Sequence, residues 1–178
     1  MSLFKFQNYS AIKNAQDNPR VVATAITKNG YAFGITDASG AENQGVFADA
    51  TSAKGDVWVA INVIDKPEIM NTSDYQIEVG EYIRAFNLNK LVGEKVELTK
   101  DLVVTAYASV AVGDKLIPCN GTDDATTPML WRKAIITDTG YNVVLEVTAK
   151  TAFGAFTIDG SVAGGFEAKI KSIPATVW

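Results

Sequence analysis

Hydrophobic and polar residues alternate with a period of two along much of the chain, which is typical of strands with one buried face and one solvent face. The alternation is clear at residues 81–86 and 95–98. The most continuously apolar run of the chain, at residues 57–64, instead predicts a strand buried on both faces. No segment keeps a 3.6-residue period over three turns, so the pattern predicts an all-β fold.

One short phrase occurs three times between residues 79 and 118. It reads VGEYI at residues 79–83, VGEKV at 92–96 and VGDKL at 112–116. The glycine is expected to take the positive φ that a tight turn needs, and the acid beside it to stay in water. The residues that follow can then begin a strand. The copies lie 13 and 20 residues apart, which leaves no room for crossover helices and predicts antiparallel strands.

Turn residues elsewhere predict three further hairpins and one brief strand. The brief strand is expected at residues 45–47. The hairpins are expected to pair residues 20–27 with 31–35 over Asn29-Gly30, residues 130–137 with 142–151 over Asp138-Thr139-Gly140, and residues 153–158 with 165–173 over 159–164.

The predicted fold is a small antiparallel β-barrel or β-sandwich with an extended N-terminal arm. The chain has 178 residues, enough for a core that needs no metal or disulfide. We divide it into an arm at 1–19 and a β-rich domain at 20–178. The domain is either one unit or two packed β units, at 20–90 and 91–178.

The arm and the last residue are the expected contacts with other subunits. Phe4 and Phe6 alternate like a short strand, and Tyr9 follows them. The arm either rests on a neighbouring subunit or packs on its own domain, and Trp178 either docks on a partner or packs internally. If the arm reaches a neighbour, deleting residues 2–18 is expected to weaken attachment while the domain stays folded.

Charge excludes one large class of partner. The formal net charge is −4 and is spread evenly, with no basic tail or stripe, so nucleic-acid binding is not expected. Residues 65–81 carry five acids and one lysine. This stretch is either a solvated loop or a patch that docks on a basic partner.

The absence of histidine and the presence of a single cysteine narrow the possible chemistry. Ser-His-Asp and Cys-His catalysis and the common histidine-containing zinc sites are excluded. Cys119 cannot form an intrachain disulfide and is expected to be a small hydrophobic residue. No signal sequence opens the chain and no apolar run reaches the roughly 20 residues of a membrane span, so synthesis in the cytoplasm and no membrane contact are expected.

Three groups of residues have both a structural and a functional interpretation. The first, Asp138-Thr139-Gly140, matches the aspartic-protease tripeptide but is also an ordinary hairpin turn. The second could supply oxygen ligands for calcium or form a solvated loop, and consists of Asn120, Thr122, Asp123 and Asp124. The third could form a sugar-stacking platform or belong to the core, and consists of Trp58, Trp131 and Trp178. In each case we favour the structural interpretation (hairpin turn, solvated loop or core) for the residues inside strands or loops. We expect no catalytic residue, metal or cofactor.

The chain resembles the head decoration (cement) proteins of tailed bacteriophages. The resemblance rests on residues 74–77 (DYQI) leading into 79–86 (VGEYIRAF), with support from 112–116. It implies a β-rich structural protein, without an active site, that binds the outside of an assembled capsid and reinforces it. The implied partner is the major capsid protein, and the implied location is the virion exterior after synthesis in the bacterial cytoplasm. Oligomeric state varies in this class, and trimers at capsid symmetry sites are common, so a homo-oligomer is expected here, with a trimer favoured.

The alternative is a carbohydrate-binding module of a phage fibre or tail accessory protein. Such a module needs exposed aromatic side chains with polar residues beside them. Trp131 and Tyr141 exposed side by side would favour it. An enzyme is the third choice, because the available Asp, Glu, Lys, Ser, Thr and Tyr residues form no recognisable arrangement.

Overall fold

The computed structural model describes residues 4–8, 19–37, 43–47, 51–63, 75–119, 129–152 and 164–172. Strands dominate these ranges. Helical structure within them is confined to three short 3₁₀ turns: η1 (Leu88–Leu91), η2 (Lys100–Leu102) and η3 (Tyr107–Ser109). The predicted all-β barrel or sandwich fold is confirmed.

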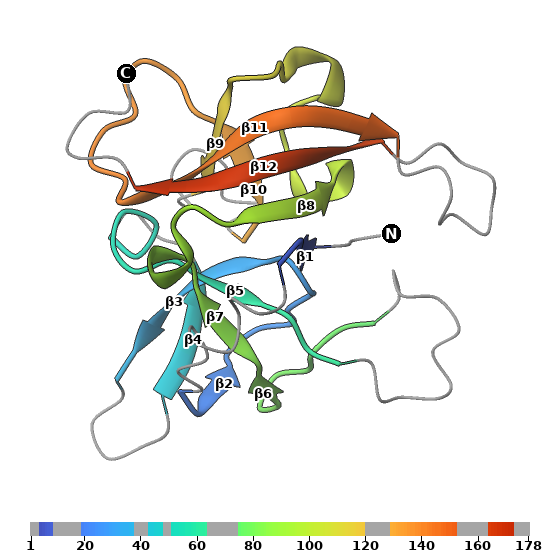
Figure 1. Cartoon of the computed structure of the whole chain (residues 1–178). Helices are drawn as coiled ribbons and strands as arrows, with labels where there is room; N and C mark the ends of the chain where they lie inside the picture. Colours follow the sequence, from blue (N-terminus) through green and yellow to red (C-terminus); the bar gives the residue numbers. More distant parts are fainter. Residues whose placement is uncertain are drawn as a thin grey trace.

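The strands form two six-stranded sheets, which lie one above the other in Figure 1. Sheet 1 has the order β1 (Phe4–Phe6), β8 (Lys95–Thr99), β12 (Gly164–Ser172), β11 (Val143–Ala152), β9 (Lys115–Pro118) and β10 (Trp131–Lys133). Sheet 2 has the order β6 (Tyr82–Ile83), β2 (Val21–Ala23), β4 (Asn43–Phe47), β3 (Ala32–Thr36), β5 (Trp58–Ala60) and β7 (Ala85–Asn87). All pairs are antiparallel except β2 with β4, which run parallel.

Sheet 2 curls until its two edges almost meet. Its edge strands β6 and β7 are consecutive in the chain, separated by Arg84 alone, and they pair with opposite sides of the sheet. The side chain of Asn62 bridges this junction. Its Oδ1 accepts the Arg84 N–H at 2.7 Å and its Nδ2 donates to the Tyr82 carbonyl at 2.9 Å. Sheet 2 is therefore nearly a barrel, and an amide side chain replaces backbone pairing where the strand bends.

Strand β5 explains the continuous apolar run of the sequence. Val57 and Val59 belong to the core shared by the two sheets, whereas Trp58 and Ala60 belong to the core inside sheet 2. The run predicted to be buried on both faces is confirmed for residues 57–60. Beyond it, Val63 is exposed, because the chain leaves the sheet there.

The N-terminal segment is part of the fold, and the prediction that Phe4 and Phe6 leave the β body is wrong. β1 pairs antiparallel with β8, and both phenylalanines are buried in the shared core. The ring of Phe4 stacks on Trp131, and that of Phe6 contacts Phe86. Burying two phenylalanines stabilises the fold by several kcal/mol, roughly 1.5–3 kcal/mol each, which favours intrachain packing over an exposed arm.

The three repeated phrases form three equivalent turns, as predicted. Their glycines have φ of +88° (Gly80), +100° (Gly93) and +92° (Gly113). In each turn the glycine N–H donates to the carbonyl of a residue on the neighbouring strand, and that residue's N–H donates to the carbonyl of the acid. The neighbouring residues are Ala23, Ile170 and Val147, respectively. Each turn therefore begins the ladder of the strand that follows it.

The acids of the first and third turns also hydrogen-bond to the backbone of their own turns. The carboxylate of Glu81 accepts the Glu78 N–H at 2.8 Å, and that of Asp114 accepts the Ala111 N–H at 2.6 Å. The side chain thus closes the turn three residues back along the chain. This bond satisfies a backbone donor that the turn itself leaves unpaired.

Two of the three predicted hairpins are wrong. Over Asn29-Gly30 a tight turn does form, but β2 pairs with β4 and β6 whereas β3 pairs with β4 and β5. β10 pairs with β9 and not with β11. Local turn chemistry predicted where the chain reverses, but strand partners were selected by burial in two cores. The third hairpin involves residues 153–158, which lie outside the described part of the chain; its other strand, β12, pairs with β11 and β8.

Candidate interaction surface

The four residues predicted to contact other subunits have different outcomes. Phe4 and Phe6 are only 3% and 2% exposed and contact their own chain. Tyr9 and Trp178 lie outside the described residues. The alternation of apolar and polar residues at positions 4–6 misled the sequence interpretation. It shows that one face of the strand is apolar, but it does not show whether that face packs on the same chain or on a neighbour.

The aromatic side chains considered for sugar binding are buried. Trp131 and Tyr141 are 0% and 2% exposed, so they offer no stacking face. Trp131 belongs to the shared core, where its indole N–H donates to the Gly30 carbonyl. Trp58 is also buried, inside sheet 2.

Asp138 closes a turn and pairs with a buried arginine. Its Oδ2 accepts the Ile135 N–H at 2.7 Å, as the acids of the repeated turns do. Its two oxygens also accept from Arg132 at 2.6 and 2.7 Å. Burial by itself would raise the pKa of Asp138, but the bonds from Arg132 and Ile135 hold that pKa below its usual range. Asp138-Thr139-Gly140 is therefore a structural turn.

The remaining chemical candidates give no site in the described ranges. Cys119 is buried, and residues 120–124 lie outside those ranges. Among the described residues, no three Asp, Glu or Cys side chains converge as metal ligands would. No helix in the same part of the chain is both long and apolar enough to cross a membrane.

Four exposed apolar side chains lie on segments at or next to β6 of sheet 2. They are Ile26, Val63, Val79 and Tyr82, which are 50%, 68%, 63% and 47% exposed, and we refer to them as the β6 patch. Single exposed apolar residues are ordinary, but a group contributed by three separate segments is typical of a contact surface.

Backbone pairing brings these segments together. Thr27 and Ile77 exchange hydrogen bonds of 2.8 and 3.0 Å, so Ile26 and Val79 sit on facing loops beside this bridge. The bond from Asn62 Nδ2 to the Tyr82 carbonyl brings the segment that carries Val63 next to β6.

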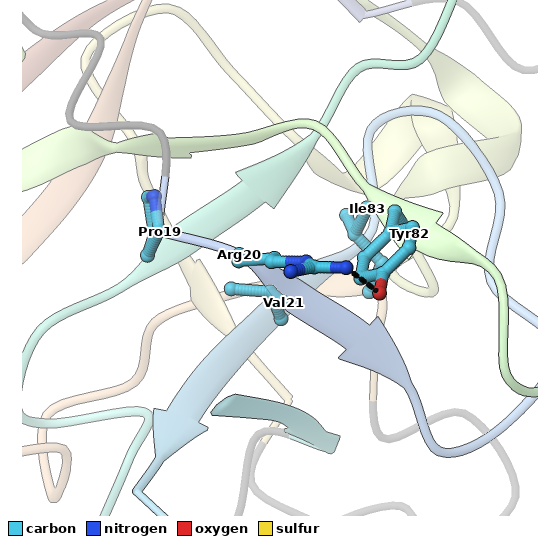
Figure 2. Close-up of a pocket in the computed structure, with 5 residues that line it drawn as sticks. All are labelled: Pro19, Arg20, Val21, Tyr82 and Ile83. Carbon is cyan, nitrogen blue, oxygen red and sulfur yellow. Dashed lines mark hydrogen bonds between the residues drawn. The ribbon is translucent and has the colours of Figure 1, made fainter. Parts of the chain in front are cut away.

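Arg20 fixes the orientation of Tyr82. Its guanidinium carbon lies 4.9 Å from the centre of the phenol ring, and its Nη2 donates to Tyr82 Oη at 2.7 Å. Figure 2 shows the Arg20 guanidinium directed at the phenol oxygen of Tyr82. Both side chains line an open pocket of about 380 Å³, together with Pro19, Val21 and Ile83. A ring held this way loses little conformational entropy on binding, and Tyr and Arg are the residues that most often dominate interfaces.

Carboxylates border the patch. Glu78 is exposed and accepts from Gln76, and Glu81 closes the turn that carries Val79. The patch is thus apolar at its centre with acids at the Val79 side. It matches an apolar partner surface with basic residues at its edge.

Sequence reasoning missed the β6 patch, although a signal for it existed. Val79 is the residue before the glycine of a tight turn, a position whose side chain projects away from both strands. Val92 and Val112 occupy the same position in the other two turns and are also exposed. Ile26, Val63 and Tyr82 had no comparable signal, since only the pairing of β2 with β6 and the bond from Asn62 to Tyr82 bring their segments together.

Comparison with known proteins adds no family to this description. No protein-family model, no curated protein and no solved structure matches the chain.

Proposed function

We propose that the protein is a structural virion protein that binds the outer surface of a phage capsid and stabilises it. It acts without catalysis and is carried on the exterior of the virion after synthesis in the host cytoplasm. Its partner is the major capsid protein, and it assembles as a homo-oligomer, with a trimer favoured.

One observation supports this proposal more than any other. Residues 74–86, on which the resemblance to decoration proteins rests, contain both Val79 and Tyr82 of the β6 patch. The segment that suggests the function is thus also the segment that supplies exposed apolar surface. We therefore propose the β6 patch as the capsid contact in place of Phe4 and Phe6. Tyr9 and Trp178 stay proposed contacts.

A contact of ordinary size is sufficient for this role. A specific interface buries roughly 800 Å² on each partner. A protein that binds only the assembled capsid stabilises that state by mass action, and many equivalent copies add their contributions. No reaction has to be accelerated, so a rigid β scaffold with a pre-oriented Tyr82 is adequate.

Co-sedimentation with capsids tests the proposal. The probe is the expanded head of the tailed phage that encodes the chain, prepared without this protein, and the readout is saturable binding of the purified chain. Val79→Asp should weaken binding by about tenfold or more, since it replaces an exposed apolar side chain of the contact with a charge. Ile136→Ser is the matched control, because Ile136 is 80% exposed just after β10 of the other sheet.

The outcomes distinguish an error in the proposed function from an error in the proposed contact surface. If the wild-type chain does not bind heads, the proposed function is wrong. If it binds and only Ile136→Ser weakens binding, the function stands and the β6 patch is the wrong surface. Light scattering of the free protein gives the oligomeric state, for which a trimer is expected.

The carbohydrate-binding alternative lacks the feature that would favour it. Trp131 and Tyr141 are both buried, so neither belongs to an exposed aromatic platform. A glycan screen becomes the next experiment only if the chain fails to bind heads.

A further inference from the structure

Asn29 and Gly30 are held in the fold by four hydrogen bonds to other parts of the chain. Asn29 Nδ2 donates to the Asn62 carbonyl at 2.9 Å, and Asn29 Oδ1 accepts the Asn62 N–H at 2.7 Å. The Gly30 N–H donates to the Ala60 carbonyl at 2.8 Å, and the Gly30 carbonyl accepts from Trp131 Nε1 at 3.1 Å. Three of these hydrogen bonds tie the dipeptide to β5 of sheet 2 and the residues just after it, and the bond from Trp131 ties it to sheet 1.

The same dipeptide is the most reactive one for loss of a side-chain amide. The backbone nitrogen of the glycine attacks Cγ of the asparagine, a new N–Cγ bond forms, and the Cγ–Nδ2 bond breaks with release of ammonia. Water then opens the five-membered imide. Opening at Cγ leaves aspartate, and opening at the main-chain carbonyl leaves isoaspartate. Glycine permits this ring because it has no side chain to obstruct the approach.

We infer that Asn29-Gly30 is a deamidation site that the native fold keeps closed and that unfolding opens. In the fold, the attacking Gly30 nitrogen donates its hydrogen bond to the Ala60 carbonyl. The Asn29 side-chain amide that would be attacked is held by hydrogen bonds to the carbonyl and the N–H of Asn62. Cγ cannot swing toward the Gly30 nitrogen unless these bonds break together. Opening therefore requires local or global unfolding, which is a rare event for a segment between two cores.

The products do not fit the site that the amide leaves. An aspartate at position 29 would face the Asn62 carbonyl with an oxygen where Nδ2 now donates, and two acceptors repel. An isoaspartate would also lengthen the backbone by one atom next to Gly30. That glycine has no room to move, because a Cβ there would overlap Leu102 and approach Phe4. Modification in the unfolded chain thus hinders refolding.

Peptide mass spectrometry of the whole chain tests the inference directly. Wild-type protein is incubated at mildly alkaline pH, once folded and once in concentrated urea, and modified residue 29 is measured over time. The chain carries a second Asn-Gly at Asn120-Gly121, which serves as a chemical reference in urea. In urea both sites should react at similar rates, whereas in the folded protein Asn29 should react at least about tenfold more slowly than in urea.

A pair of variants separates the clamp from general stability. Asn62→Ala removes the amide that ties Asn62 to Arg84 and Tyr82, and should speed modification of Asn29 in the folded protein by severalfold. Asn89→Ala removes a comparable bond from Asn89 Oδ1 to the Val57 N–H and should not. An equal increase in the rate of Asn29 modification in both variants would overturn the inference that the Asn62 segment protects Asn29. If Asn62→Ala does not fold, the wild-type comparison still decides, because similar rates in folded and unfolded chain overturn the inference.

Discussion

The indole N–H of Trp131 donates a 3.1 Å hydrogen bond to the carbonyl of Gly30, and this bond joins the two sheets. Trp131 begins β10 of sheet 1, whereas Gly30 lies in the turn before β3 of sheet 2. Phe4 of β1 packs against both, through ring stacking on Trp131 and close approach to Gly30. The N-terminal strand, the first turn and a late strand thus meet at one point of the core.

Gly30→Ala should destabilise the protein more than Gly80→Ala. Both glycines have positive φ, near +90°, which costs an L-residue roughly 1–2 kcal/mol. At Gly80 a Cβ meets nothing within 4 Å, so this backbone term is the whole expected cost. At Gly30 the Cβ also overlaps Leu102, which adds roughly 1–3 kcal/mol. Urea unfolding of both variants measures the difference. Equal losses in the free energy of unfolding would show that the Leu102 side chain moves aside without cost.

Phe6→Ala should cost about 3–5 kcal/mol in the free energy of unfolding, because Phe6 is fully buried against Phe86. Lys5→Ala is the control in the same strand. Lys5 is paired with Glu97 at 2.9 Å but is 40% exposed, so its loss should cost about 1 kcal/mol or less. Deletion of residues 2–8 should likewise destabilise the domain. A deleted chain with wild-type stability would contradict the placement of β1 in the core.

Asp138→Asn and Asp114→Asn compare the same turn bond in two environments. The pair of Asp138 with Arg132 is buried, with side chains 10% and 11% exposed, whereas the pair of Asp114 with Lys133 is more open. Removing one partner of a buried pair leaves an uncompensated charge, so Asp138→Asn should cost about 3 kcal/mol. Asp114→Asn should cost about 1 kcal/mol or less. Thermal unfolding of both variants measures this, and the reverse order would be incompatible with the burial of Arg132.

Acid should weaken the fold through Glu167. Hydrogen bonds from Lys95, Thr148 and Gln7 lower the pKa of Glu167 from 4.5 to about 2. Since the unfolded chain then binds more protons than the folded one, this contribution to stability is complete above about pH 5 and is lost as the pH falls toward 2. Urea unfolding between pH 5 and pH 2 should therefore show a steeper loss of stability in wild type than in Glu167→Gln. Equal slopes of unfolding free energy against pH in the two proteins would contradict the three hydrogen bonds to Glu167.

The sequence by itself determined the class of the fold and the places where the chain turns. Period-two alternation and the repeated Val-Gly-acid phrase depend on local chemistry, so positive φ at Gly80, Gly93 and Gly113 follows from their immediate neighbours in the chain. The apolar run at 57–60 likewise carried enough information to predict burial on both faces, because no polar residue interrupts it.

Only the tertiary structure decided which strands pair and which apolar residues stay exposed. Phe4 and Val79 are both apolar, yet Phe4 is buried under Trp131 and Val79 is 63% exposed on a turn. Pairing between distant strands, such as β1 with β8 and β2 with β6, depends on the closure of sheet 2 and on the core that both sheets share. That long-range choice follows from the total apolar area buried, which no single stretch of sequence contains.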